Sequence, residues 1–450
     1  MKDNGKYYEI EDLYDDQKFA VETVLKKLRE WVETPDLAEF QPLRLTINGS
    51  GGCGKSVIIN TLVTAIRRMF DRNDVVQVAA PTGTAAFNVG GKTLHSLMHM
   101  GVDKFDYKPK SLRDVSRARL VNDFKSLLAL IIDERSLISS KDLGTVETMM
   151  SETIYRGGLL NRLSFGGLPV LVLVGDDYQL PSTSSGAIDI IGATGGSKMV
   201  LNGRDVFLDC AKHVIELTAS KRLADDRMQD REIIRKVRVR EDLHDFEVKK
   251  LLSLHTDNII SVHGKDVMDS IASTAMYLFF RNAPRIRHNL ERLSTIHSSE
   301  KPAGFFRCQG TGVVGGKPIR SHFNSDPPPT AIFCEDAQVA VDGRNFYPEW
   351  GIHNSACGRV DEIVLKKDEN PNFGDLPEYV VVDFPGYCGP VWDENNPTVR
   401  TRTVWSQTSY SENRITTNAT IYLFVIRSNT STACSHPNCH LVLFERNELL

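Results

Sequence analysis

The feature that most constrains the fold is a glycine-rich loop between an apolar run and an amphipathic segment. Residues 49–56 read GSGGCGKS and fit the pattern G-x-x-x-x-G-K-[ST]. The run LRLTING at 43–49 predicts a buried strand, and apolar residues recur at the spacing of one helix face over 58–70. A strand, a glycine loop and a helix in this order form a cradle in which backbone N–H groups and the helix N-terminus hold phosphates.

Within this loop, the pattern places Lys55 at the β and γ phosphates and the Ser56 hydroxyl on Mg²⁺. A glycine-rich turn without a ligand is the alternative, and the flanking strand and helix make it the weaker one. We expect Cys53 to be a small loop residue and not a nucleophile. The loop residues predicted to bind a nucleotide such as ATP are Gly49, Ser50, Gly51, Gly52, Cys53, Gly54, Lys55 and Ser56.

Further apolar runs predict a parallel sheet around this cradle. They alternate with longer helical patterns, which favours an α/β fold with a sheet covered on both faces and ligands at the carboxyl ends of its strands. The segment 184–203 is rich in glycine and predicts a loop, and 220–300 is mostly charged and helical. The additional predicted strands are 75–80, 127–132, 169–175 and 213–218, followed by β-like runs at 337–341, 359–365 and 378–384.

Length and charge limit what else the chain can be. At 450 residues it is too long for one core, so two to four domains are expected. A formal net charge of −4 excludes a global attraction to nucleic acid, so any polyanion must bind in a local groove.

Targeting signals are not evident. The acidic N-terminus resembles neither a secretory signal nor a transit peptide, and no window of about 18 apolar residues predicts a membrane span. Eight scattered cysteines show no disulfide framework, which favours a reducing compartment. We therefore expect the nucleus or the cytosol, with the mitochondrion left open, and neither membrane association nor an obligate protein partner.

An acidic pair ends one predicted strand. In LLALIIDERS, Asp133 and Glu134 follow the apolar run directly. One carboxylate there suits Mg²⁺ binding, and the second suits a general base that takes a proton from an attacking water. The alternative is the acidic first turn of a helix.

Two further candidates follow later strands. In LVLVGDDYQLPS, Gln179 is placed to orient a water or contact the γ-phosphate; a loop amide bonded to backbone is the alternative. In ELTASKRLADD, Arg222 follows a strand and is placed to stabilise charge on the transferring phosphoryl group. A surface arginine is the alternative, and spacing alone favours it.

These motifs together resemble the Pif-type (petite integration frequency) ATP-dependent DNA helicases of superfamily one and, less closely, their RecD relatives. The stretch APTGTAAFNVGGKTLHS at 80–96 is similar to the family's Thr-Gly-x-Ala-Ala…Gly-x-Thr-Leu-His-Ser segment. GSGGCGKS, DERS and GDDYQLPS occur in the family's order, and 336–364 resembles a later segment ending Asn-Gly-x-x-Gly-x-Val. The resemblance covers roughly 12–390 and is strongest before residue 225.

The resemblance implies an ATP- and Mg²⁺-dependent helicase that acts on single-stranded DNA or DNA junctions. It implies that Gln17 reads adenine and that one segment contacts single-stranded DNA, where small and hydroxyl residues suit phosphate contacts. For His95 the alternative is a buried histidine with satisfied hydrogen bonds. The implied DNA-binding residues are Thr82, Gly83, Thr84, His95 and Ser96.

The resemblance also implies a domain order. It predicts a RecA-like ATP-binding domain at 1–215, a partial second RecA-like domain at 216–335, a β-rich SH3-like insertion at 336–390 and a divergent tail at 391–450 with little order. The family's His-Lys-Ser-Gln-Gly and Ala-Leu-Ser-Arg stretches do not occur between Gly386 and Leu450. A fragment that binds ATP and single-stranded DNA without helicase activity therefore stays an alternative, as does a P-loop ATPase or kinase that does not act on nucleic acid.

The motifs also depart from the family's pattern at single positions. Arg135 follows the acidic pair where the family is usually apolar, and Asp177 and Ser182 flank Gln179. These departures leave the chemistry possible.

Overall fold

The computed structural model divides the chain into two compact units, Met1–Lys250 and Leu251–Leu450. The residues that the structure describes are 8–35, 39–99, 114–154, 163–182, 196–218, 227–275, 277–279, 281–296, 304–306, 313–314, 317–318, 331–341, 347–353, 356–364, 379–389, 399–401 and 424–427.

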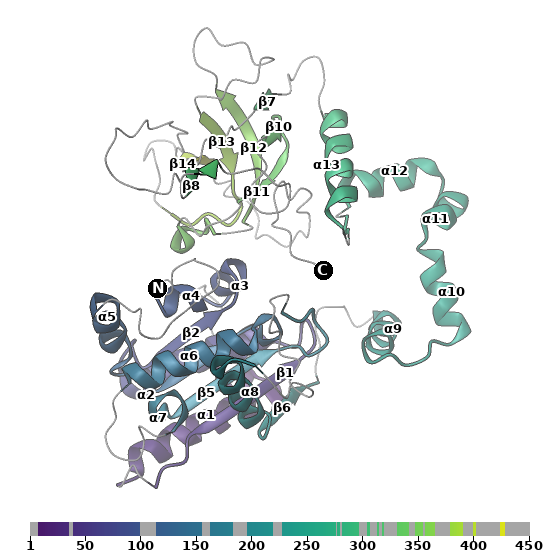
Figure 1. Ribbon diagram of the computed structural model, residues 1–450. Coiled ribbons are helices and arrows are strands. Elements are labelled where there is room, and N and C mark those ends of the chain that lie inside the picture. The colour runs from purple at the N-terminus through teal and green to yellow at the C-terminus, as the bar shows by residue number, and fades with distance from the viewer. Residues whose placement is uncertain are drawn as a thin grey trace. The chain divides into compact units, whose positions relative to one another are not determined.

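A parallel sheet of six strands forms the centre of the first unit (Figure 1). Its strand order is β3-β2-β4-β5-β1-β6, so β1, which leads into the glycine loop, lies between β5 and β6. The predicted α/β fold with a parallel sheet is confirmed, and β3 is the one strand of this sheet that the sequence did not predict. The strands are β1 Leu43–Gly49, β2 Val76–Ala80, β3 Lys92–Thr93, β4 Ala129–Ile132, β5 Val170–Gly175 and β6 Val214–Leu217.

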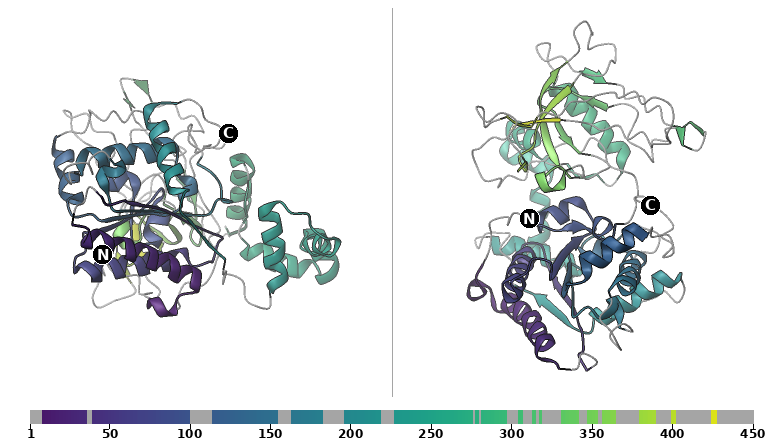
Figure 2. Two further views of the ribbon diagram at one scale, coloured as in Figure 1. Left: turned by 90° about the horizontal axis from the view of Figure 1, so that it is seen from below. Right: turned by 90° about the vertical axis from the view of Figure 1, so that its left-hand side faces the viewer.

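Both faces of this sheet are covered by helices (Figure 2). Successive side chains of a strand point to opposite faces, and β5 shows the consequence. Val170, Val172 and Val174 join a core with α1 (Asp15–Glu33) and α2 (Lys55–Phe70). Leu171 and Leu173 join a second core with α6 (Ser140–Thr153) and α8 (Lys198–Cys210). Burial on both faces explains why this strand is apolar throughout.

Shorter elements complete the first unit. They include two helices that follow β2 and β3, and two that follow the last strand of the sheet. Their bounds are η1 Ile10–Asp12, α3 Gly83–Asn88, α4 Leu94–Leu97, α5 Asp114–Phe124, η3 Arg135–Leu137, α7 Ser164–Gly167 and α9 Met228–Val239, and α10 Asp245–Ser253 contains the limit between the two units.

The loop predicted at 184–203 is wrong for residues 198–203, which form the start of α8; residues 183–195 lie outside the described part. The glycine that favoured a loop serves helix packing instead. A β-carbon on Gly203 would lie 2.8 Å from the backbone nitrogen of Gly144 on α6. Glycine thus lets the two helices approach closely, a reason that local sequence does not reveal.

The second unit contains helices followed by short strands. Five of the strands form one sheet with the order β11-β12-β13-β15-β14, and Val360, Val382 and Phe384 belong to its core. The helices are α11 Thr256–His263, α12 Lys265–Thr274 and α13 Asn282–Ile296, and the other elements are β7 Gly304–Phe306, β8 Val313–Val314, β9 Lys317–Pro318, β10 Ala331–Phe333, β11 Gln338–Ala340, η6 Pro348–Trp350, β12 Cys357–Val364, β13 Tyr379–Asp383, β14 Val399–Thr401 and β15 Phe424–Arg427.

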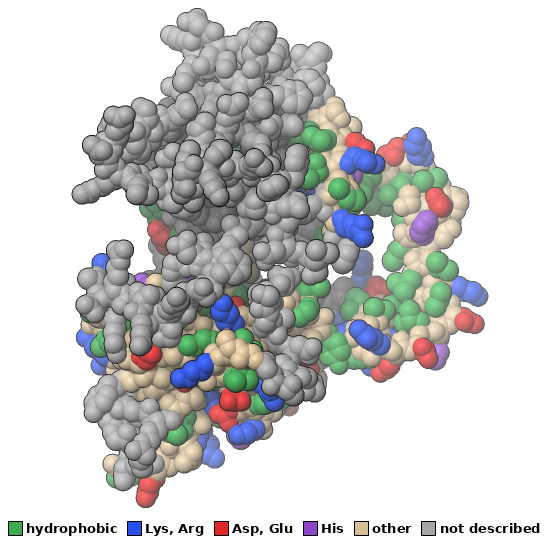
Figure 3. Space-filling view, viewed as in Figure 1, with side chains coloured by type: hydrophobic (Ala, Val, Ile, Leu, Met, Phe, Trp, Pro, Cys, Tyr) green, Lys and Arg blue, Asp and Glu red, His purple; other side chains and the backbone are tan. Residues whose placement is uncertain are grey.

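The predicted helical character of 220–300 and the β-like runs after residue 336 agree with these elements. In α11 and α12, apolar side chains such as Val262 and Ile271 are exposed among charged ones (Figure 3). Two strands, β14 and β15, lie in the tail where we expected little order. The predicted domain limits and the second RecA-like domain stay predictions. Within the described ranges, no helix has the length and apolarity that crossing a membrane requires.

The contact between α6 and α8 generates a stability prediction. A β-carbon on Gly144 would lie 2.7 Å from the backbone nitrogen of Gly203, and backbone atoms cannot move aside like a flexible side chain. We expect Gly144→Ala to lower the free energy of unfolding by about 2–3 kcal/mol, measured by urea denaturation. Gly386→Ala is the control, because no atom lies within 4 Å of the added carbon there. Equal stability of the two variants would contradict this close packing.

Candidate functional site

The glycine loop at 49–56 leads directly into the N-terminus of α2. Gly52 and Gly54 have φ angles of +87° and +85°, which only glycine adopts without strain. Gly54 occupies the N-cap position of α2 without a side-chain cap, so the first N–H groups of the helix face the loop. The Lys55 Nζ donates hydrogen bonds to the carbonyl oxygens of Gly49 (2.7 Å) and Ser50 (3.1 Å). The loop thus gathers N–H donors and a cation, which suits phosphate oxygens.

Gln17 lies against this loop. Its side chain comes from the first turn of α1, and the residue is only 5% exposed. The Gln17 Nε2 donates to the carbonyl oxygen of Cys53 (2.9 Å), and its Oε1 accepts from the Tyr14 N–H (3.2 Å). A β-carbon on Gly54 would collide with the same Nε2. Gln17 therefore fixes α1 to the phosphate loop, while its role in reading adenine stays a prediction.

The acidic pair follows β4 at the carboxyl edge of the sheet. Burial raises the pKa of Asp133 to about 6, and the nearby charge of Glu134 also raises it, whereas the Glu134 backbone N–H and the charge of Lys55 lower it. Lys55 and Asp133 therefore lie within electrostatic reach of each other. Glu134 has a left-handed backbone (φ +51°), which is uncommon for a residue with a side chain. Such strain is frequent at functional sites.

These carboxylates fit a divalent cation. Asp133 Oδ1 and Glu134 Oε2 are buried atoms with no hydrogen-bond partner among the described residues. Unpartnered buried carboxylate oxygens are costly without a cation, and Mg²⁺ prefers oxygen ligands. Ser56, the second residue of α2, is exposed at the end of the loop and could supply a hydroxyl oxygen.

The two later candidates are less defined. The Gln179 side chain is exposed, and its backbone N–H donates to the Asp176 carbonyl oxygen (3.2 Å) in the turn after β5. This turn lies at the same edge of the sheet as the acidic pair, because all strands are parallel. Arg222 lies outside the described residues. Their chemical roles stay predictions.

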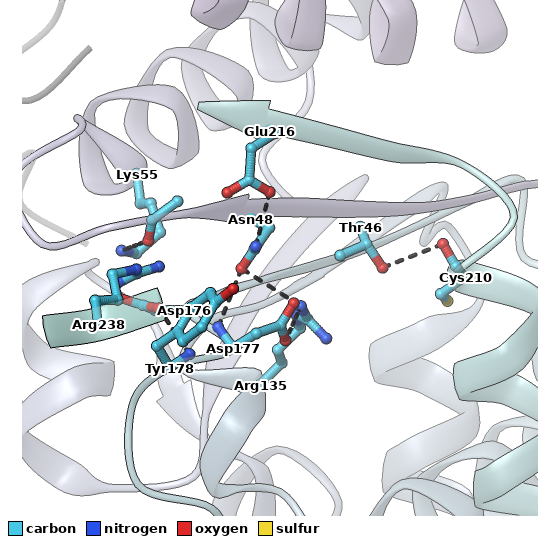
Figure 4. A network of polar contacts seen from close by, with 11 residues as sticks. Thr46, Asn48, Lys55, Arg135, Asp176, Asp177, Tyr178, Cys210, Glu216 and Arg238 are labelled. Carbon is cyan, nitrogen blue, oxygen red and sulfur yellow. Dashed lines mark hydrogen bonds and ion pairs between the residues drawn. The ribbon is translucent and has the colours of Figure 1, made fainter. Parts of the chain in front are cut away.

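A polar network joins the ends of four strands beside the glycine loop (Figure 4). Asn48, the residue before Gly49, donates from Nδ2 to Glu216 Oε2 on β6 (2.7 Å). Its Oδ1 accepts from the backbone N–H of Asp177 (3.1 Å). The Asp177 carboxylate in turn forms an ion pair with Arg135, the residue after Glu134. The loops after β4 and β5 are thereby linked to the strand that carries the phosphate loop.

A second arginine reaches this region from α9. Arg238 Nη1 lies 2.5 Å from Asp176 Oδ2, and its guanidinium lies 4.5 Å from the ring centroid of Tyr178 (Figure 4). Asp176 is buried and close enough to Cys53 for its charge to raise the pKa of that thiol, for which burial is the larger cause. The sequence analysis missed Arg238 because more than sixty residues separate it from Asp176 and no motif marks it. Asn48 and Asp176 could have been found as polar residues at strand ends.

The candidate DNA-binding residues follow β2 and β3 and so lie at the same carboxyl edge. Thr82 is the N-cap of α3, where its Oγ1 accepts from the Ala85 N–H (3.2 Å). Gly83 is buried in the first turn of that helix. His95 and Ser96 are exposed on α4, so a buried His95 is wrong. Thr84 lies on α3 and is partly buried.

Comparison with known proteins identifies this part of the chain. Residues 32–241 match the family model described as PIF1-like helicase. This stretch is therefore similar to PIF1-like helicases. The match includes the phosphate loop, the acidic pair, Gln179 and all of α9.

Among curated relatives, ATP-dependent DNA helicase PIF1 of Saccharomyces cerevisiae (strain YJM789) is 34% identical over 137 residues, which are 30% of this chain and 15% of that protein. ATP-dependent DNA helicase Pif1 of Psychrobacter sp. (strain PRwf-1) is 32% identical over 140 residues, 31% of this chain and 20% of that protein. The chain therefore spans only a small part of the length of these relatives.

Solved structures support the fold. The Pif1 helicase from Candida albicans aligns with a TM-score of 0.56 at 20% identity, covering 83% of this chain and 75% of that one. A structure of two coordinating Pif1 helicases at forked double-stranded DNA aligns with a TM-score of 0.53 at 18% identity, covering 84% and 75%. At such identities the likeness concerns the fold alone.

The raised pKa of Asp133 generates a pH prediction. As the pH falls, the native state binds a proton at Asp133 before the unfolded chain does, so in metal-free protein this residue increases stability towards acid pH. Asp133→Asn removes the buried charge, and a shift of about two pKa units corresponds to roughly 3 kcal/mol gained at pH 8. The gain should disappear as the pH falls to about 4. Urea denaturation in EDTA across this range measures it.

The control for Asp133 is Asp74. Arg72 holds the pKa of the exposed Asp74 carboxyl below its usual value, so Asp74→Asn should have an effect of the opposite sign and small size. If the free energy of unfolding of Asp133→Asn equalled that of the wild type at every pH, the carboxylate would not be the buried and unpaired group that the structure describes.

Proposed function

We propose that the chain acts as an ATP-dependent DNA helicase, which couples ATP hydrolysis to translocation on single-stranded DNA and to duplex unwinding. The observation that carries the proposal is the convergence of Lys55 with Asp133 and Glu134 at one edge of the sheet, where buried carboxylate oxygens have no hydrogen-bond partner in the part of the chain that the structure describes. The PIF1-like domain and relatives that are named ATP-dependent DNA helicases support the same activity.

The residues divide the chemistry among them. Lys55 exchanges its contacts with the loop carbonyls for the β and γ phosphates of ATP, and the N–H groups at the start of α2 hold the phosphate oxygens. Asp133 and Ser56 would hold Mg²⁺, which would supply positive charge to neutralise the phosphates. Glu134 accepts a proton from the attacking water, and Gln179 orients that water. Arg222 adds positive charge at the γ-phosphate.

Single-stranded DNA is proposed to bind across α3 and α4. Thr82 and Ser96 offer hydroxyl groups, and the exposed ring of His95 can stack on a base or contact a phosphate. These helices follow β2 and β3 at the sheet edge that also carries the ATP site. A change in the ATP site can therefore reach the DNA through adjacent strand ends. With a net charge of −4, such local contacts and not a global field would hold the strand.

The finer assignment rests on the resemblance of the motifs to the Pif-type helicases, a family whose activity serves these processes. We propose that the activity serves DNA repair, recombination or telomere maintenance on single strands and junctions, in the nucleus or the cytosol. Strand displacement on a forked duplex, measured with a fluorescent strand, tests unwinding. Binding of ATP and DNA without displacement would favour a fragment that binds both without helicase activity.

The role of Glu134 generates a kinetic prediction. Glu134→Gln preserves size but removes the general base, so we expect the ATP turnover stimulated by single-stranded DNA to fall about 10²–10⁴-fold. The KM for ATP should change little, because Lys55 and the N–H groups at the start of α2, which are proposed to hold the phosphates, are unchanged. Phosphate release measured with and without DNA gives the turnover rate and the KM for ATP.

Glu33→Gln, at the exposed end of α1, is the matched control and should keep wild-type turnover. Wild-type turnover no faster than that of Glu134→Gln would contradict the proposal. If the protein hydrolysed ATP but neither bound DNA nor was stimulated by it, a P-loop ATPase or kinase that does not act on nucleic acid would be favoured.

The exposure of His95 generates a binding prediction. We expect His95→Ala to weaken single-stranded DNA binding by about 1 kcal/mol, or roughly fivefold in Kd, because one stacking contact is lost. His213→Ala is the control, since His213 is also exposed but directly precedes β6, at the opposite edge of the sheet. Fluorescence anisotropy across salt concentrations measures both. Equal Kd values for the two variants would exclude a DNA contact at His95.

A further inference from the structure

The loops after β4 and β5 each carry a group proposed to act on the attacking water. Glu134 lies in the first loop and Gln179 in the second, and the general base works only if both groups keep a fixed distance from one water. The residue after Glu134 is Arg135, and Asp177 lies two residues before Gln179. Their side chains form an ion pair directly between the two loops (Figure 4).

Arg135 is held in place by more than this ion pair. The residue is only 5% exposed despite its charge. A β-carbon on Gly175 would lie 2.6 Å from Arg135 Cγ, so the arginine passes directly over the end of β5. Its guanidinium also lies 5.3 Å from the ring centroid of Phe207 on α8. A buried guanidinium held in this way has little freedom to find another acceptor.

Asp177 is fixed from its other side. Its backbone N–H donates to Asn48 Oδ1 (3.1 Å), and the same oxygen lies 3.5 Å from Arg135 Nη2. Asn48 is the last residue before Gly49 of the phosphate loop. These three contacts join the loop that carries Glu134, the loop that carries Gln179 and the strand that leads into the glycine loop.

We propose that Arg135 is a positioning residue for ATP hydrolysis, because its ion pair with Asp177 fixes the Gln179 turn relative to Glu134. The inference rests on the function proposed above. Arg135 and Asp177 are two departures from the family's pattern in separate motifs, and the structure makes them partners. A positively charged residue after the acidic pair is therefore matched by a negatively charged residue in the next loop.

The first experiment measures coupling of the loops without any turnover. In Arg135→Met, hydrogen exchange should accelerate on the order of tenfold in 176–179, where the Asp177 N–H bonds Asn48 and the Tyr178 N–H bonds Asp176. Asp177→Asn should accelerate exchange in 133–137, on the other loop. Asp74→Asn breaks an exposed ion pair of the same kind at the start of β2 and should change neither segment.

The second experiment measures the effect on catalysis. We expect Asp177→Asn to lower kcat about tenfold to a hundredfold with KM for ATP nearly unchanged, because the water-orienting group is displaced while the phosphate loop is not. Asp177→Glu keeps the charge and should restore part of the rate. The double variant Arg135→Met/Asp177→Asn should be no slower than Asp177→Asn alone, since both changes break one contact.

The outcomes separate this inference from the proposed function. Wild-type protein that does not hydrolyse ATP would contradict the proposed function, while hydrogen exchange would still decide whether the pair couples the loops. A lower melting temperature in Asp177→Asn with unchanged exchange in 133–137 and unchanged kcat would overturn the inference and leave Arg135 a structural residue. Additive losses of kcat in the double variant would also overturn it.

Discussion

The buried carboxylate of Asp133 is the constraint on which the candidate site depends. Burial disfavours its charged form enough to raise the pKa to about 6, and Lys55 offsets only part of that cost. A protein selected for stability alone would place an apolar residue or an amide here, because an unpartnered buried charge is unfavourable. The cost is understandable if a cation completes the site, since the same oxygen atoms then gain a partner. The unpartnered oxygen of Glu134 beside it fits the same explanation.

The parallel sheet brings the other candidate residues to the edge at which Asp133 lies. Because every strand of the sheet points the same way, the ends of β1, β4 and β5 deliver the phosphate loop, the acidic pair and the glutamine turn to one edge. The strands can do this only because their side chains fill both faces, as the alternation along β5 shows. Polar residues at these ends, such as Asn48 and Asp176, are almost fully buried. Asn48 accepts a hydrogen bond from the loop after β5, and Asp176 accepts one from the Tyr178 N–H within its own turn. The packed core thus holds the strands in place, and the polar network fixes the loops at their ends.

The sequence predicted what depends on local order. The strand before GSGGCGKS, the helix after it and the strand before Asp133 follow from periodicity, and the structure confirms them. Contacts between distant segments were not predictable in this way. Gly203 favours a loop by its local sequence, and its packing against Gly144 could not be predicted because Gly144 is far away in the sequence. In the same way, the sequence alone shows Arg135 and Asp177 as unrelated departures from the family's pattern. The predicted alternative of a buried His95 failed because the four-residue helix α4 turns this side chain outwards, towards solvent.

The position of α9 shows how such distant contacts define a domain. This helix follows the last strand of the sheet, yet Arg238 reaches the buried Asp176 at the end of β5. On the same helix, Lys236 Nζ lies 3.0 Å from Glu247 Oε2 on α10, and both of these side chains are largely buried. Removing either partner of such a pair leaves the other charge without its partner, which is unfavourable. The pair between Arg238 and Asp176 joins α9 to the sheet of the first unit, and the PIF1-like match includes all of α9. Since Asp176 also lies near Cys53 of the glycine loop, one buried carboxylate joins this helix to the candidate nucleotide site.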